Sequence, residues 1–112
     1  MDSIEIGYRV KRTDTDYNCW ISWGRKGYYF SIEEKCVLFK LSVLQNEVKL
    51  WNLVQENKLE LVETKYKMIN KSFDKIEIYD DNNIKINIDT SRWKVFDWDE
   101  DKPNNNVCIS WR

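Results

Sequence analysis

Four carboxylates lie within five residues near the end of the chain, and they form the densest group of side chains that could do chemistry. Asp97, Asp99 and Asp101 alternate like the first ligands of a calcium loop, where oxygen atoms at every second position suit a hard cation. The rest of such a loop is missing. Lys102 stands where the sharp turn needs glycine, and Cys108 stands where a bidentate glutamate should bind. We therefore expect no metal site here.

The same acidic stretch, residues 97–101, has a second interpretation as a surface that faces a partner. Carboxylates so close together repel one another, and a basic surface on a partner would relieve that repulsion. An acidic loop that ends a strand and is only hydrated is the plainer alternative. Both interpretations place the stretch on the surface of the protein.

Six tryptophans in 112 residues is a high number, and tryptophan serves both cores and interfaces. Trp23, Trp93 and Trp111 are in phase with the apolar residues around them, which predicts core packing. Trp20 and Trp98 are out of phase, so a sheet with one hydrated face would expose both indoles, whereas a sheet covered on both faces would bury them. The candidate partner-binding residues are Trp20, Asp97, Trp98, Asp99, Glu100 and Asp101.

Most catalytic and cofactor chemistry lacks its usual residues in this sequence. Histidine is absent, which excludes imidazole metal ligands and a histidine general base. There are only three glycines, and neither G-x-x-x-x-G-K-S/T nor G-x-G-x-x-G occurs. Any two of the 19 acidic residues could converge, but no feature singles out a pair. We expect no enzymatic activity, no catalytic residues, no cofactor and no bound metal.

Charge and cysteine content restrict the partners and the compartment. Lys and Arg total 18 against 19 Asp and Glu, and each half of the chain is nearly balanced, so no surface for nucleic acid is expected. No apolar run approaches the length of a membrane span, and the first residues lack a signal-peptide pattern. Three cysteines without C-x-x-C spacing favour a reducing compartment. We expect a cytoplasmic protein that binds neither nucleic acid nor membrane.

Alternation of apolar and polar residues dominates the chain and predicts half-buried strands. Turn residues at 24–27 and 80–83 each predict a hairpin. We expect a single mainly β domain over residues 1–112, an antiparallel barrel or sandwich of about nine to ten short strands. The expected strands fall in 4–10, 17–23, 28–32, 37–43, 48–53, 59–68, 76–78, 84–88, 93–95 and 107–111.

The segment 31–56 also fits a helix. Ser31 and Glu34 have the spacing of a capping box, and apolar residues then recur at steps of four and three from Val37 to Trp51. Other apolar residues, such as Phe39, would lie on the opposite side of that helix, which requires burial all round. The alternative fold is therefore α+β, a curved antiparallel sheet with one helix within 31–56.

These features favour a small non-enzymatic binding protein, best described as an inhibitor or immunity-like protein that neutralises a toxin or effector protein by direct binding. Burial of Trp20 and Trp98 would supply the contact, and the 97–101 carboxylates would engage a basic active site of the target. An exposed sheet edge could also pair two copies into a homodimer.

Two other function classes stay open. A barrel could hold a small ligand in a cavity lined by Trp23, Phe39, Tyr66 and Trp93. A carbohydrate-binding module would instead present several coplanar exposed aromatic rings.

Overall fold

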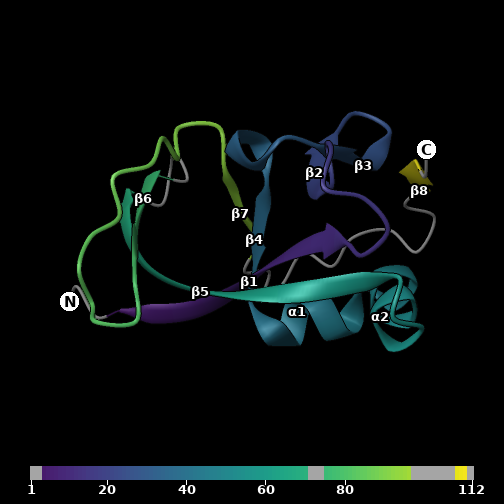
Figure 1. Cartoon of the computed structure of the whole chain (residues 1–112), viewed down its shortest axis with the longest axis horizontal. Helices are drawn as coiled ribbons and strands as arrows, with labels where there is room; N and C mark the ends of the chain where they lie inside the picture. Colours follow the sequence, from purple (N-terminus) through teal and green to yellow (C-terminus); the bar gives the residue numbers. More distant parts are fainter. Residues whose placement is uncertain (1–3, 71–74, 97–107, 111–112) are drawn as a thin grey trace.

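The computed structural model describes residues 4–70, 75–96 and 108–110. Within them lie eight strands, two α-helices and one 3-10 turn (Figure 1). They follow the chain in the order β1 (Glu5–Arg12), β2 (Trp20–Gly24), β3 (Gly27–Ser31), η1 (Glu33–Lys35), β4 (Val37–Phe39), α1 (Leu41–Asn46), α2 (Val48–Gln55), β5 (Leu59–Asn70), β6 (Lys75–Tyr79), β7 (Lys94–Phe96) and β8 (Cys108–Ser110).

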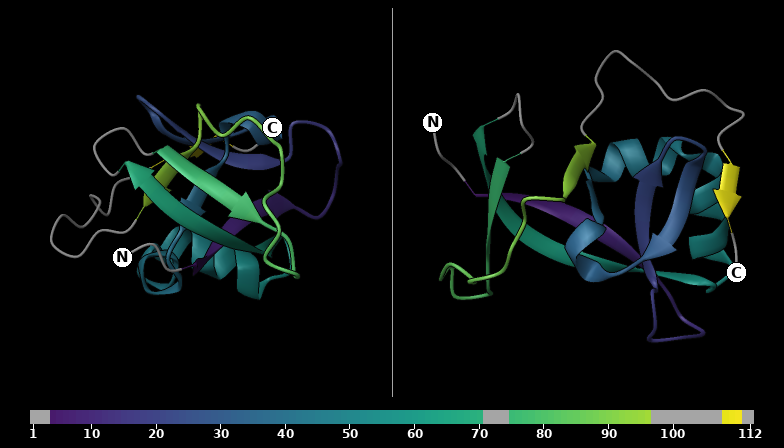
Figure 2. Two further views of the ribbon diagram at one scale, coloured as in Figure 1. Left: turned by 90° about the vertical axis from the view of Figure 1, so that its left-hand side faces the viewer. Right: turned by 90° about the horizontal axis from the view of Figure 1, so that it is seen from above.

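The described strands form a single mixed sheet in the order β6-β5-β1-β2-β3-β8; off this path, β4 pairs with β1, and β7 pairs with β4. The longest pairing is the antiparallel one between β1 and β5, which runs from Glu5 opposite Tyr66 to Arg12 opposite Leu59. Two pairings, β3 with β8 and β4 with β7, are parallel. Figure 2 shows both helices on the same side of the long β1–β5 pair.

The sheet forks at β1. One edge of β1 pairs with β5, and the other edge pairs with β4 where Tyr8 faces Phe39 and with β2 where Lys11 faces Trp20. Gly7 lies in β1 beside the buried Leu38 of β4. A Cβ atom at Gly7 would come within 2.9 Å of the Leu38 side chain. A side chain at this position would have to displace the buried leucine, which explains the glycine.

The alternation of side chains along the strands divides the core into two clusters. Residues such as Val10, Ile21 and Phe39 pack with the helices, whereas Leu38 and Tyr66 belong to a second cluster formed with β6, β7 and Trp93. The four residues expected to line one ligand cavity are divided between the clusters: Trp23 and Phe39 in the first, Tyr66 and Trp93 in the second.

The prediction of a mainly β chain is confirmed, but the expected antiparallel barrel does not form, because the sheet of the described residues is mixed and not closed. In the described part of the chain the sheet is mixed, its ends β6 and β8 do not pair, and helices cover one face. The α+β alternative, a curved sheet with a helix within 31–56, fits better. The parallel pairs β3–β8 and β4–β7 could not be predicted from local sequence, because each joins segments that are distant in the chain.

The predicted helix begins later than its capping signal. Ser31 ends β3, Glu34 lies in the 3-10 turn, and helix starts only at Leu41. The run Val37–Phe39 is strand, and all three of its residues are buried because both faces of β4 are covered. Apolar residues on both sides of the expected helix thus belong to two different elements, one strand and one helical segment.

The turn at 80–83 forms as predicted, but its second arm does not. Asp80 Oδ1 accepts hydrogen bonds from the backbone nitrogens of Asn82 and Ile84, and Asn83 takes a positive φ of 62°. Beyond the turn one bridge joins Tyr79 to Lys85. The expected strand at 84–88 is absent from the described structure, and Ile84 stays 62% exposed.

Candidate functional site

Trp20 lies on the sheet face opposite to the helices. It opens β2 and pairs with Lys11 of β1, while its neighbours Ile21 and Trp23 point into the core beside the helices. Successive strand residues point to opposite faces, so Trp20 joins Arg9 and Lys11 on the other side. The indole is half-buried and packs against the second core cluster.

Arg9 packs its guanidinium against the Trp20 ring. Its guanidinium carbon lies 4.6 Å from the centre of the Trp20 ring and 5.0 Å from that of Trp93. Nη1 donates to Glu33 Oε2 at 2.6 Å, and Nε donates to Thr64 Oγ1 at 3.0 Å. Only 12% of the Arg9 side chain is exposed. Two rings, one carboxylate and one hydroxyl therefore hold a planar cation in one orientation.

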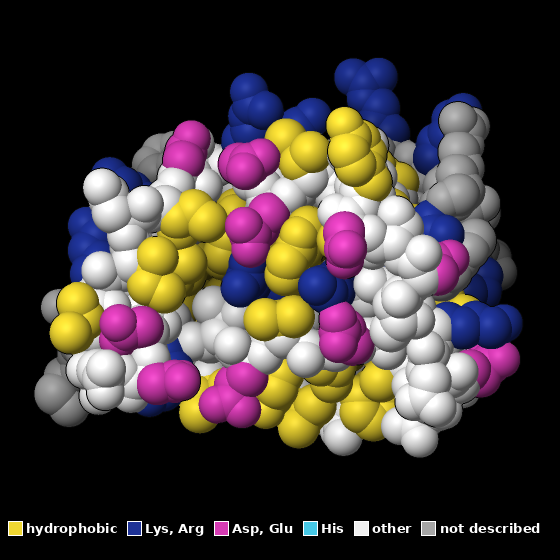
Figure 3. All heavy atoms as spheres, in the orientation of Figure 1, with side chains coloured by type: hydrophobic (Ala, Val, Ile, Leu, Met, Phe, Trp, Pro, Cys, Tyr) yellow, Lys and Arg dark blue, Asp and Glu magenta, His cyan; other side chains and the backbone are white. Residues whose placement is uncertain are grey.

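Lys11 completes the surroundings of the indole. Its Nζ lies 5.6 Å from the Trp20 ring centre and 3.5 Å from Glu60 Oε1. We call Arg9, Lys11, Trp20, Glu33 and Glu60 the Trp20 face. In the space-filling view of Figure 3, basic side chains near the centre lie among acidic and hydrophobic ones. Each cation of the Trp20 face has a carboxylate partner, so the surface is close to neutral.

Beneath the Trp20 face lie groups whose burial makes them unreactive. Cys36 is fully buried, and loss of hydration raises the pKa of its thiol to about 12. Such a thiol stays protonated and is a poor nucleophile. Trp93 is 2% exposed, and its indole Nε1 has no hydrogen-bond partner among the described residues. Both side chains pack in the core and support Arg9.

A buried hydrogen-bonded pair, Tyr28 and Glu47, lies away from the Trp20 face, where α1 meets α2. The Tyr28 hydroxyl donates to Glu47 Oε2 at 2.5 Å, and both residues are buried. Loss of hydration raises the pKa of the Glu47 carboxyl, and the bond from Tyr28 opposes part of that rise. Burial, aided by the nearby carboxylate, also raises the pKa of Tyr28, so its hydroxyl remains a donor.

The structure places one of the six predicted partner-binding residues. Trp20 lies as described above, whereas Asp97, Trp98, Asp99, Glu100 and Asp101 lie outside the described residues, and their role stays a prediction. Sequence reading missed Arg9 as a neighbour of Trp20, and it missed Glu33 and Thr64 as the groups that hold Arg9. The alternation of β1 did place Arg9 and Lys11 on one face, but the register between β1 and β2 was needed to bring that face to Trp20.

The described residues hold no cluster of three or more His, Cys, Asp or Glu side chains placed to bind a metal ion. No helix in the described ranges has the length and apolar character needed to span a membrane. Comparisons with protein families, with curated proteins and with solved structures find no match to this chain.

Proposed function

We propose that this chain is a non-enzymatic binding domain that attaches to a protein target through the Trp20 face, in the manner of a small inhibitor or immunity-like protein. The observation that carries the proposal is the half-exposed Trp20 indole held between Arg9 and Lys11. Tryptophan and arginine are the residue types that contribute most to binding at protein interfaces.

Rigidity strengthens this argument. Ordering a flexible side chain on binding costs about 0.5–1.5 kcal/mol, and a side chain already fixed avoids most of that cost. Trp20 rests on Arg9, which is itself held by Glu33 and Thr64. The indole is therefore presented in one orientation before any partner arrives.

The charges of the Trp20 face suit a protein partner better than a nucleic acid. Arg9 and Lys11 are each balanced by a carboxylate, Glu33 and Glu60 respectively, which leaves no positive surface for a phosphate backbone to follow. The acidic stretch 97–101 remains a proposed second contact, aimed at a basic active site of the target. A cytoplasmic location and a homodimer through a sheet edge likewise stay predictions.

The two other function classes have less support. An open sheet does not enclose a central ligand cavity of the kind found in closed barrels. The aromatic contacts within the first core cluster, such as Trp23 with Tyr28 at 66°, are tilted or edge-on, unlike a flat platform for sugars.

The test compares two aromatic truncations, Trp20→Ala and Tyr17→Ala. Tyr17 is 83% exposed and is not braced by cations, so it is the matched control. A target identified by capture from the native host should bind Trp20→Ala at least about 30-fold more weakly by calorimetry, a loss of about 2 kcal/mol. Tyr17→Ala should bind nearly as tightly as the wild type.

Trp20 also packs on the core, so folding must be checked separately. Glu60→Lys changes a side chain that is half exposed and disturbs the Trp20 face without removing the indole. Weaker binding by this variant, with an unchanged unfolding midpoint, supports the proposal. Equal affinity of the wild type, Trp20→Ala and Glu60→Lys contradicts it.

A further inference from the structure

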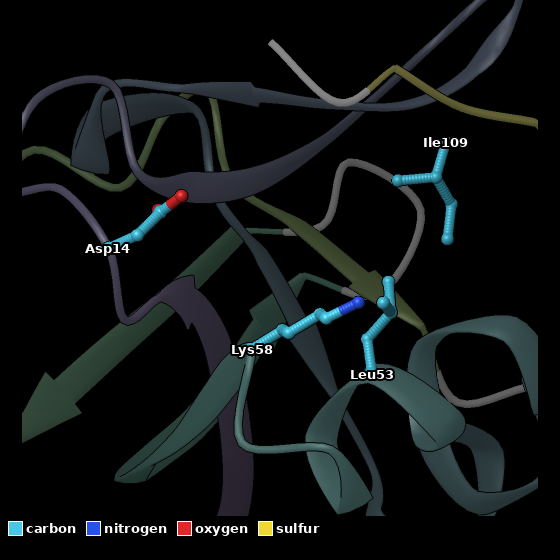
Figure 4. A pocket seen from close by; sticks show the side chains of 4 residues that line it. All are labelled: Asp14, Leu53, Lys58 and Ile109. Atoms are coloured by element: carbon cyan, nitrogen blue, oxygen red, sulfur yellow. The ribbon is translucent and has the colours of Figure 1, made fainter.

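A pocket of about 450 Å³ opens at the end of the β1–β5 pair and shares no residue with the Trp20 face. Among the described residues, it is lined by Asp14 from the loop after β1, Leu53 from α2, Lys58 from the turn before β5, and Ile109 from β8 (Figure 4). The volume lies within the range of small-molecule sites, which is about 300–1,000 Å³.

The walls of this pocket are tied to one another by the backbone. Lys58 N donates to Leu53 O at 3.0 Å, and Lys58 O accepts from Thr13 N and Thr13 Oγ1, both at 3.2 Å. Asn57 takes a positive φ of 62° to make this turn. The loop, the helix and the turn are thus held together, so three of the four described walls are fixed without a ligand.

Lys58 carries the charge that a ligand can reach. Both carboxylate oxygens of Asp14 already accept from Arg12, at 2.8 and 2.7 Å, which balances the charge of Asp14. The Lys58 ammonium has a looser contact, 3.6 Å to Glu56 Oε1, and both of these side chains are more than half exposed. A hydrated pair of this kind is weak and exchanges readily for another carboxylate.

We propose that this pocket binds a small organic acid with one carboxylate, which pairs with Lys58, and a short apolar body, which lies against Leu53 and Ile109. Lys58 is the one cation among the described residues that line the pocket, and Glu56 lies beside it. A singly charged anion is favoured over a phosphate ester, because each added negative charge is repelled by the Glu56 carboxylate. The site is separate from the proposed protein-binding function and does not depend on it.

The test uses hexanoate as the probe, followed by the NMR methyl signals of Leu53 and Ile109 in the full-length protein. We expect saturable shifts with a Kd of about 1 mM, as suits a ligand of this size. Lys58→Gln should weaken binding by about fivefold or more, and Lys58→Arg should retain it. The control Lys26→Gln, at the exposed tip of the β2–β3 hairpin, should bind like the wild type.

Two further probes test the chemistry. Hexylamine and inorganic phosphate should neither shift these methyl signals nor compete with hexanoate. The proposal is overturned by absence of saturable shifts with hexanoate, by equal binding of hexylamine, or by unchanged affinity in Lys58→Gln. Trp20→Ala should leave hexanoate binding unchanged, so failure of the protein-binding proposal and failure of this one are distinguishable.

Discussion

Arg9 and Glu47 are both charged side chains drawn into the folded protein, but their surroundings differ. Arg9 has a carboxylate, a hydroxyl and two aromatic rings around its guanidinium. Glu47 has one neutral donor, the hydroxyl of Tyr28. Opposite charge favours the ionised form of a buried group, whereas burial with a neutral donor still penalises ionisation.

The contrast separates two roles. Arg9 is held in a fixed position and supports the half-exposed Trp20, so its region suits recognition. Glu47 lies at the junction of α1 and α2, where its backbone oxygen accepts from Trp51 N at 2.9 Å, and its carboxyl has a raised pKa. The bond between Glu47 and Tyr28 of β3 therefore stabilises the packing of the two helices on the sheet. Three substitutions test this difference.

Arg9→Ala should have the largest effect, a loss of about 2–3 kcal/mol in the free energy of unfolding. The substitution removes the guanidinium that packs against the Trp20 and Trp93 rings. It also removes the cation that pairs with Glu33. Urea unfolding followed by tryptophan fluorescence measures the loss. Arg25→Ala, at an exposed hairpin tip, is the matched control, and a similar small change in both variants would refute the bracing role.

Tyr28→Phe should destabilise the protein by about 1–2 kcal/mol, because the nearly buried Glu47 carboxyl loses its donor. Tyr29→Phe alters the next residue along the strand, whose hydroxyl has no hydrogen-bond partner among the described residues, and should change stability little. Thermal unfolding of the two variants gives the comparison. Equal melting temperatures would show that the buried bond contributes nothing.

Glu47→Gln should have the smallest effect, visible as a change in pH dependence. The folded protein raises the pKa of Glu47 above its ordinary value of 4.5, so the unfolded chain ionises more readily. Stability from this group is complete below pH 4.5 and falls as the pH rises through the raised pKa. Gln cannot ionise, so the stability of the variant relative to the wild type should increase from pH 4 to pH 8.

The pH series has its own control. Glu77 is a surface carboxyl whose pKa is lowered by its bond from Lys85, so Glu77→Gln should show the opposite trend. Its relative stability should fall as the pH rises from 3 to 6. Parallel pH profiles for the two glutamine variants would contradict the distinction between a buried carboxyl with a neutral donor and a carboxyl paired with a lysine.

Much of the local structure follows from the sequence. The alternation in β1, the glycine turn that joins β2 to β3 at Gly27 with a φ of 111°, and the turn at Asp80 were all predictable from residue types. So was the position of Trp20 on the face opposite to Ile21. The start of the helix was not, because the capping signal at Ser31 is overridden by the pairing of β3 with β2 and of β4 with β1.

Residue type and spacing by themselves determined which side chains share a face of each strand, because that alternation depends on neighbours within a few residues. They did not determine every strand, since the expected strands at 48–53 and 84–88 are a helix, α2, and an irregular segment. Only the tertiary structure decided that β1 pairs with three strands, that β7 pairs with β4 and β8 with β3 in parallel, and that Arg9 and Lys11 meet Trp20. The physical reason is that strand register is selected by packing between segments distant in the chain, and local alternation is the same for every even shift of that register.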